Sequence, residues 1–375
     1  MKTKILGITT IVVLILLVVT INFAFFSENK TNDEFTIGVI APLTGAQAFL
    51  GEGIVQGIKL AVNEMQANGE KVKAIYEDSQ GDVATAVSAY NKIKATSDVD
   101  VFVLVSTGDE AILDLAGKDK IPVILTVSST SGLPSKNKYT FRYFTNADDD
   151  APEMAKYAVN SLGLKKFGVL HLLDNFGISY SNVFSKEVAK LGGEVVVSES
   201  FQYTDVDYKT QLAKLAEKDI DSIYVIGLDY QEIEALKEIE ELGIDKQIIA
   251  VGTIAGQYSL KDSQGAAEGV YVTAFCTDGT PAGFVEKFQS RYSSYPSFFA
   301  VMGYDIGEIV DRANKEGEVS TSEFMGNLHL IQNMRTNVGI VNTDSSGEIK
   351  IPTCAKVIQE DNKIFNLVTG QYSYY

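Results

Sequence analysis

Residues 35–69 read FTIGVIAPLTGAQAFLGEGIVQGIKLAVNEMQANG, and this stretch decides the fold. Its first part, residues 36–41, is an apolar run that Pro42 ends, as in a buried strand. An amphipathic helix follows, and its apolar face is formed by Ile54, Ile58, Ala61 and Met65. About ten residues connect the two, and long loops in compact domains are usually functional. Because ligands of open α/β sheets bind at the carboxyl ends of strands, we expect this loop to border a ligand site.

Strand and helix patterns then alternate along the chain. Apolar, strand-like segments occur at residues 72–76, 101–105, 123–127, 167–173, 194–197, 222–227, 247–252 and 270–275. Amphipathic helical segments separate most of them, which predicts an α/β fold with mostly parallel sheets covered by helices on both faces. Because single sheets rarely exceed about ten strands, we expect two doubly wound lobes with a break near residues 141–150. A terminal β-meander is predicted at residues 338–343, 348–359 and 364–368.

The composition limits the partners of the chain. Its 375 residues are enough for two lobes with full cores, and its formal net charge is −17. The acidic residues are spread over the whole chain beyond residue 35 and oppose binding to phosphate backbones. We therefore expect no nucleic-acid partner.

The N-terminus carries a separate apolar segment. Lys2 and Lys4 precede residues 5–26, which are mostly apolar and long enough to cross a bilayer. Basic residues before this segment and an acidic chain after it place the bulk of the protein outside the cytoplasm. We expect residues 1–26 to form an uncleaved transmembrane anchor and residues 27–34 a polar tether. A cleaved signal peptide, which would leave a secreted or periplasmic protein, is the alternative.

The only two cysteines, Cys276 and Cys354, both fall at the ends of predicted strands. An oxidising compartment permits a disulfide between them, but two buried free thiols fit the sequence equally well. The sequence does not show whether the two residues are close together, so both alternatives stay open.

The sequence offers little support for an enzyme active site or a cofactor site. Gly51, Gly53 and Gly57 form G-x-G-x-x-x-G, which is one residue longer than the dinucleotide fingerprint and lies too far beyond the strand. The glycines suit a close approach to a ligand or to the other lobe instead. The two histidines, His171 and His329, have no second ligand at metal spacing, and each fits a packed position. We therefore expect no cofactor, no metal and no enzyme activity.

Hydroxyl and aromatic side chains follow several predicted strands. The hydroxyls are Ser106 after one strand and Ser128, Ser129 and Thr130 after the next. Hydroxyls and free backbone amides at strand ends suit a ligand carboxylate, although any single serine there more often caps the next helix. In the second lobe, Phe176 and Tyr230 follow strands, where they either pack in the core or stack on a ligand in a cleft.

Several motifs occur in an order and at a spacing that span residues 35–368. They are IGVIAPLTG at 37–45, LAVNE at 60–64, AIL at 111–113, KIPVIL at 120–125, SST at 128–130, YTFR at 139–142, DNFG at 174–177, MGYD at 302–305 and GIVNTDSSGE at 339–348. Together they resemble the branched-chain amino-acid (Leu/Ile/Val) binding family of extracytoplasmic solute-binding proteins of ABC transporters, which has the type I periplasmic-binding fold.

The resemblance implies two lobes that close over a small ligand. Three crossovers would join the lobes, near residues 143–150, 275–280 and 338–342. Lobe 1 would comprise residues 35–143 and 279–338, and lobe 2 would comprise residues 148–275 and 341–375.

The resemblance also implies roles for individual residues of the cleft. Ser106 matches a hydroxyl that grips the ligand carboxylate, and Ser128 and Thr130 match a pair that contacts both the carboxylate and the ammonium. The aromatic and side-chain positions are Phe176 in place of a stacking tyrosine, Tyr230 as a second-lobe tyrosine, Phe299 as a pocket aromatic and Leu50 where an aromatic is common.

One departure from the family pattern concerns the ammonium. An acid usually follows the strand predicted at residues 247–252, but this chain has Gly-Thr-Ile-Ala at residues 252–255. An unpaired ammonium in a closed cleft is costly. Asp229, beside Tyr230, is the substitute that the sequence offers. Otherwise the ligand lacks an α-ammonium and is an amide, a short carboxylate or an aromatic acid.

The function expected from these features is that of a monomeric receptor outside the cytoplasm. It would capture an amino acid or a related small molecule by hinge closure and deliver it to an ABC permease. The alternative is a sensory ectodomain of the same fold that recognises an amide or a small carboxylate.

Overall fold

The computed structural model describes residues 34–375 except 46, 256, 277–280, 315–318, 360–362, 368–371 and 374–375, and it does not describe the side chains of residues 229, 255, 257–259 and 372–373. The predicted anchor and all but the last residue of the predicted tether lie outside this part of the chain. Within it, no helix combines the length and the apolar character that crossing a membrane requires.

Five parallel strands form the first sheet, in the order β2-β1-β3-β4-β5. They are β1 (Phe35–Ala41), β2 (Val72–Asp78), β3 (Val101–Val105), β4 (Val123–Thr126) and β5 (Thr140–Arg142). Side chains of β1 alternate between two hydrophobic clusters, with Val39 in one and Ile40 in the other. The strand is apolar throughout because helices cover both of its faces.

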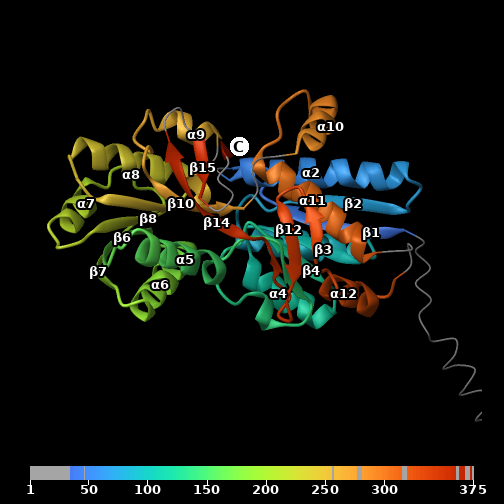
Figure 1. Cartoon of the computed structure of the whole chain (residues 1–375). Helices are drawn as coiled ribbons and strands as arrows, with labels where there is room; N and C mark the ends of the chain where they lie inside the picture. Colours follow the sequence, from blue (N-terminus) through green and yellow to red (C-terminus); the bar gives the residue numbers. More distant parts are fainter. Residues whose placement is uncertain are drawn as a thin grey trace, which may run out of the picture. The chain divides into compact units, whose positions relative to one another are not determined.

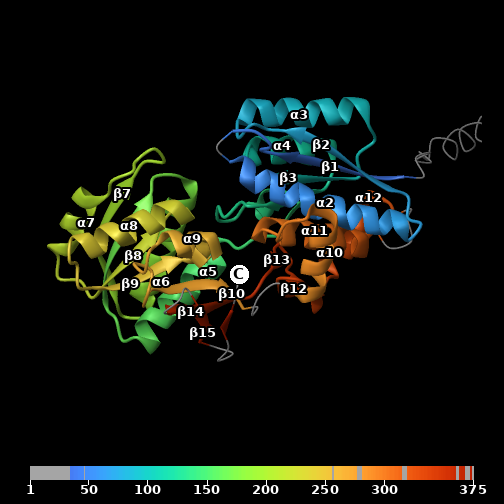
Figure 2. The ribbon, with the colours of Figure 1, turned by 90° about the horizontal axis from the view of Figure 1, so that it is seen from above.

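Helices enclose the first sheet from two sides (Figures 1 and 2). One side carries α3 (Val83–Thr96) and α4 (Asp109–Asp119), and the other carries α2 (Ala48–Ala67), α10 (Ala282–Tyr292), α11 (Phe298–Ala313) and α12 (Thr321–His329). The predicted α/β character of this half is confirmed.

Glycines bring α2 and α11 into close contact. A Cβ atom on Gly57 would lie 2.1 Å from the backbone oxygen of Ala300, and one on Gly303 would lie 2.1 Å from that of Ile54. Helix α2 also begins at Ala48, so the loop after β1 is shorter than expected and the glycine pattern lies inside the helix. Close approach does explain these glycines, and the element approached is the backbone of a neighbouring helix.

The second sheet has eight strands within the described residues, in the order β16-β15-β14-β10-β9-β8-β6-β7. Its parallel strands are β6 (Lys166–Leu172), β7 (Glu194–Phe201), β8 (Ser222–Ile226), β9 (Gln247–Val251) and β10 (Tyr271–Phe275). Three antiparallel strands extend it, β14 (Thr353–Gln359), β15 (Lys363–Asn366) and β16 (Tyr372–Ser373).

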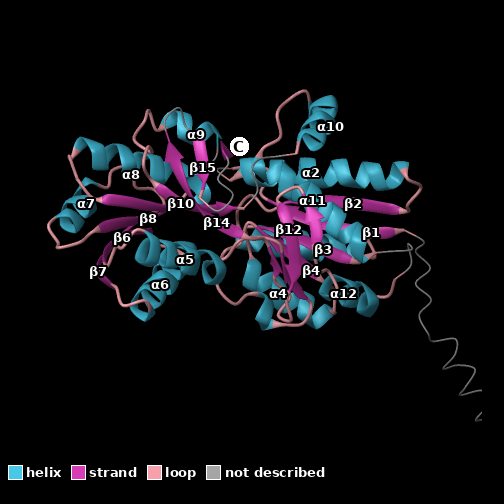
Figure 3. Cartoon of the chain, viewed as in Figure 1, coloured by secondary structure: helices cyan, strands magenta, loops and turns pink. Residues whose placement is uncertain are grey.

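Helices cover both faces of the second sheet as well (Figure 3). One face carries α5 (Ala147–Lys156), its π-helical extension (Tyr157–Ser161) and α6 (Asn175–Lys190). The other carries α7 (Lys209–Ala216), α8 (Asp229–Glu241) and α9 (Gln257–Asp262). The prediction of two doubly wound sheets is thus confirmed.

The described residues show the chain passing between the two sheets at residues 143–146 and 351–352, and β10 of the second sheet precedes α10, which packs on the first. The passage at residues 351–352 differs from the expected position near 338–342. Strands β11 (Met334–Thr336), β12 (Gly339–Thr343) and β13 (Ile349–Lys350) form a small sheet whose buried side chains belong to the cluster of the first sheet. The predicted strand at 348–359 is therefore interrupted at Pro352, which has no backbone N–H to donate.

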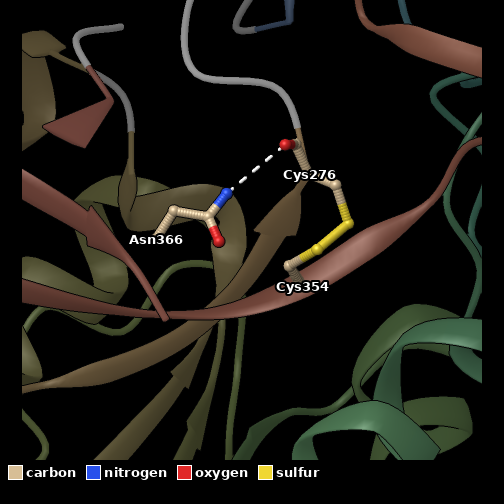
Figure 4. Close-up of a disulfide and its surroundings, with 3 residues drawn as sticks. All are labelled: Cys276, Cys354 and Asn366. Carbon is tan, nitrogen blue, oxygen red and sulfur yellow. Dashed lines mark hydrogen bonds between the residues drawn. A yellow bond between two sulfur atoms is a disulfide. The ribbon is translucent and has the colours of Figure 1, made fainter. Parts of the chain in front are cut away.

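A disulfide joins Cys276, directly after β10, to Cys354 in β14. Cys276 and Cys354 are bonded, with their Cα atoms 5.0 Å apart, and the backbone N–H of Cys276 donates to the carbonyl of Pro352 at 2.9 Å. Asn366 donates from its side chain to the carbonyl of Cys276 at 3.3 Å (Figure 4). Of the two alternatives left open by the sequence, the structure has the disulfide.

Candidate functional site

A cavity of about 220 Å³ is lined by residues of both halves of the molecule and of the connecting segment at residues 143–146. Phe49 and Leu50 of α2, Ser129 after β4, and Phe298 and Phe299 of α11 contribute from the first half. The second half contributes Phe176, Tyr180, Leu228, Val251, Gly252, Thr253, Thr273, Ala274 and Phe275, and the passages and their adjoining elements contribute Phe144, Thr145, Asp150 and Thr353. Pockets for drug-sized ligands span roughly 300–1,000 Å³, so this cavity suits a smaller molecule.

Aromatic rings form a continuous part of the wall. Phe275 and Phe298 stack with ring centroids 5.1 Å apart, and Phe298 lies 5.5 Å from Phe299. Phe299 in turn meets Phe49 edge-on at 5.9 Å. Edge-on and offset contacts of this kind hold rings in fixed orientations. The wall is therefore a preformed apolar surface rather than a set of independent side chains.

Four of the predicted site residues line this cavity. They are Leu50, Ser129, Phe176 and Phe299. Ser129 is buried in the loop after β4, and Phe176 lies in the first turn of α6, where its ring is 5.0 Å from that of Tyr180. These residues come from four segments far apart in the sequence, and the fold brings them to one cavity.

The remaining predicted residues are placed differently. Ser106, Ser128 and Thr130 are not part of the lining of this cavity, and the Ser128 hydroxyl donates to the carboxylate of Asp109. Tyr230 is half-exposed on α8, with its ring 6.5 Å from Tyr203. The side chain of Asp229 lies outside the described residues. Their roles in ligand binding stay predictions.

The backbone is unusual at the ends of β3 and β4. Ser106 has φ 62° and Val127 has φ 53°, although neither is a glycine. Positive φ is rare for such residues, above all for a β-branched one, and it tends to occur at functional sites. Ser106 begins the first predicted hydroxyl cluster, and Val127 directly precedes the second. The positive φ at both positions favours a binding role for this edge of the sheet.

A buried ion pair fixes the loop after β4. The Arg142 guanidinium, at the end of β5, donates to Glu348 from Nε at 2.9 Å and from Nη2 at 2.5 Å. Its Nη1 donates to the backbone oxygens of Ser128 and Thr130, at 3.1 and 2.5 Å. Arg142 is fully buried. Burial raises the pKa of Glu348, and the charge of Arg142 opposes that shift. The sequence analysis did not identify this pair, because its members are 206 positions apart.

Asp150 is the lining residue with a carboxyl group, and the sequence analysis also missed it. It is 2% exposed, and burial raises its pKa to about 7. A signal was present: Ala147, Ala151 and Met154 mark the buried face of α5, and Asp150 falls on the same face at helical spacing. An acid on an apolar helix face is the pattern that indicates a buried carboxyl.

The position that lacks the family acid is occupied by a hydrogen-bonded threonine. Thr253 follows β9, lines the cavity and donates to the carboxylate of Glu232 on α8. Glu232 is fully buried and also accepts from the backbone of Val251 at 3.2 Å. The hydrogen bonds of this carboxylate are thus made to groups of the protein itself.

The histidines lie away from the cavity. His329 contacts the ring of Phe141 at 4.9 Å, and Nδ1 of His171 lies 3.0 Å from the carbonyl oxygen of Leu172. In the part of the chain that the structure describes, no group of three or more His, Cys, Asp and Glu side chains could hold a metal ion.

Comparison with known proteins identifies the family of this architecture. A family model described as periplasmic binding protein matches residues 34–354. Leu/Ile/Val-binding protein homolog 2 of Brucella abortus is 24% identical over 330 residues, which cover 84% of this chain and 87% of that protein. The Leu/Ile/Val-binding protein of Escherichia coli K12 is 23% identical over 257 residues, which cover 66% and 69%.

Solved structures have the same fold. The branched-chain amino acid transporter substrate binding protein LivJ from Streptococcus pneumoniae, in complex with isoleucine, matches with a TM-score of 0.76 at 22% identity, covering 91% of this chain and 98% of that one. A solute binding protein from R. palustris in complex with benzoate matches with a TM-score of 0.75 at 21% identity, covering 89% and 95%. The predicted resemblance to Leu/Ile/Val-binding proteins is confirmed, and the chain belongs to the periplasmic binding protein family.

Proposed function

We propose that the protein is a solute-binding receptor outside the cytoplasm that captures an amino acid or a related small molecule and delivers it to an ABC permease. The observation that carries this proposal is the cavity, which residues of both halves of the molecule and of the connecting segment at residues 143–146 line together. A ligand that contacts both halves favours the arrangement in which the halves enclose it, and this arrangement is what a permease can recognise. Binding and closure, rather than chemical conversion, are the proposed activity.

The location outside the cytoplasm is supported by the disulfide. Disulfides persist in oxidising compartments and are rare in the reducing cytosol. Cys276 and Cys354 are bonded in the structure, in line with this location. We further propose that residues 1–26 anchor the protein to the membrane, which cell fractionation with an antibody to the folded part would test.

Thermal unfolding of the full-length protein in the presence of amino acids, amides and small carboxylates tests the proposed function. A compound that binds only the folded protein at 100 times its Kd stabilises it by about 2.7 kcal/mol, a shift of several degrees. We expect one chemical class to raise the midpoint without being consumed. Turnover of a compound, or the lack of any shift across the panel, would count against a receptor.

A further inference from the structure

Three consecutive aspartates at the start of α5 have different environments. The carboxylate of Asp148 accepts from the hydroxyl of Ser131, and that of Asp149 pairs with Lys350 at 3.0 Å. Asp150 is buried, and its Oδ1 has no hydrogen-bond partner among the described residues. The carboxylates of the first two acids thus have partners within the protein, whereas one oxygen of the third has none among the described residues.

The unpartnered oxygen of Asp150 belongs to the wall of the cavity. The hydroxyls of Thr273, Tyr180 and Thr353 lie close to the carboxyl and lower its pKa by hydrogen bonding, but desolvation dominates and raises it to about 7. Buried polar groups in folded proteins are nearly always hydrogen-bonded, so the Oδ1 that has no partner among the described residues is where a donor of the bound solute fits.

The described side chains around Asp150 carry no positive charge, so a cation beside this carboxyl would have to come from the ligand. On α6 and β8 the facing ionisable groups are Tyr180 and Tyr224, and on its own helix Glu153 adds negative charge. Strand β14 presents Thr353, whereas Lys356 alternates to the opposite face of that strand. Within the described residues, no Lys, Arg or His side chain lines the cavity.

The hydrogen-bond donors and acceptors that a ligand brings determine which chemical class fits beside Asp150. A primary ammonium brings three N–H donors and a positive charge, and it brings no acceptor. It can donate to Asp150 and to the Thr273 hydroxyl together. A carboxylate would bring acceptors and a second negative charge next to Asp150, which is unfavourable in a desolvated site.

We propose that Asp150 accepts the ammonium group of the bound solute, so that the receptor takes a primary amine or amino acid with an apolar side chain rather than a simple carboxylate. This proposal rests on the proposed function of the cavity. The aromatic wall formed by Phe275, Phe298 and Phe299 receives the apolar part of the solute. Asp150 thereby replaces the acid that the family usually carries after the strand corresponding to β9.

Binding of a cation to Asp150 releases a proton wherever the free protein holds the carboxyl protonated. The affinity for an ammonium compound should therefore rise with pH, by up to about tenfold per unit below pH 7, and level off above pH 7. A solute that needs protonated Asp150 as a donor would show the opposite slope.

Calorimetric titration of the full-length protein tests this with matched probes. L-leucine, L-phenylalanine and 2-phenylethylamine carry the ammonium, whereas 3-phenylpropanoate, benzoate and phenylacetamide do not. We expect at least one ammonium probe to bind the wild type and Asp150→Asn to bind it at least tenfold more weakly at pH 8, without the pH dependence. Asp149→Asn removes the same chemical group one position away and should bind like the wild type.

The outcomes separate the two proposals. Tighter binding of a carboxylate or the amide than of every ammonium probe overturns the role of Asp150 and leaves the receptor function standing. Unchanged affinity of Asp150→Asn for a bound ammonium probe, or a wild-type affinity that falls as pH rises, also overturns it. If no probe binds at all, both the inference and the proposed function are contradicted. Thermal unfolding shows whether Asp150→Asn is folded, and the wild-type pH profile decides the question independently of the variant.

Discussion

Replacing Arg142 with methionine should destabilise the protein strongly. The guanidinium is fully buried and makes two bonds to Glu348 and two to backbone oxygens of the loop after β4. Removing one partner of a buried pair leaves the other charge uncompensated and typically costs 3–5 kcal/mol. We therefore expect Arg142→Met to lower the free energy of unfolding by about 4 kcal/mol at pH 8.

The pH dependence of this cost follows from Glu348. Burial already raises the pKa of its carboxyl, and loss of the arginine charge removes a contribution that lowers it. A carboxyl whose folded-state pKa lies above its unfolded value stabilises the fold less as pH rises through that interval. The penalty of Arg142→Met should therefore be smaller at pH 5, where Glu348 can take up a proton, than at pH 8.

Urea unfolding at the two pH values measures both effects. Arg312→Met, an exposed arginine near the end of α11, is the matched control and should change stability by less than about 0.5 kcal/mol. The double variant Arg142→Met/Glu348→Gln should recover part of the loss, because the unpaired charge is gone. A cost below about 1 kcal/mol for Arg142→Met at pH 8, or an equal cost at pH 5, would refute the account of this pair.

Three further predictions follow from the disulfide, the helix contact and the buried acid. Reduction of the Cys276–Cys354 bond should lower the free energy of unfolding in urea by about 4 kcal/mol, because the bond closes a separation of 78 positions. The protein with both cysteines replaced by serine is the control and should not respond to reductant. A loss of stability below about 1 kcal/mol on reduction would contradict this prediction. Gly57→Ala places a Cβ against the backbone of the facing helix and should destabilise the protein by more than about 2 kcal/mol. Gly326→Ala, with open space around the added Cβ, should be neutral or stabilise the protein by up to about 1 kcal/mol. Equal effects of the two changes would exclude the close contact at Gly57. Without ligand, Asp150→Asn should gain stability relative to the wild type as pH rises from 4 to 8, because burial raises the pKa of the native carboxyl. Denaturant titrations across this pH range measure the difference. If the wild type instead becomes more stable relative to the variant as pH rises, the carboxyl is not desolvated.

Local patterns predicted much of the fold because they report burial directly. The apolar run at residues 36–41 became β1, and the face formed by Ile54, Ile58, Ala61 and Met65 became the buried side of α2. The third passage between the sheets was misplaced because Ile349 and Thr353 have the same strand-like pattern, and only the partners of each segment show that they belong to different sheets. Pro352, which interrupts the run, was the local sign of the break.

The cavity was predictable in kind but only partly in its residues. Ser129 and Phe176 were found because strand ends are where ligands bind in such sheets. Asp150 was missed because it stands in a run of three aspartates, and its place on the apolar face of α5 was the one local sign that sets it apart from Asp148 and Asp149. Their different solvation depends on the direction of each side chain around α5 and on the hydroxyls that other elements bring to it.

The sequence by itself determined the α/β character, the two halves and the family, since these depend on the periodicity of apolar residues and on the order of short motifs. Only the tertiary structure decided that Cys276 and Cys354 are bonded, that Arg142 holds the loop after β4 and that Asp150 is a buried acid with one unpartnered oxygen in the cavity wall. The physical reason is that each of these facts is a property of groups distant in sequence. Burial, pairing and pKa are set by what surrounds a side chain, and that is known only when the chain has folded.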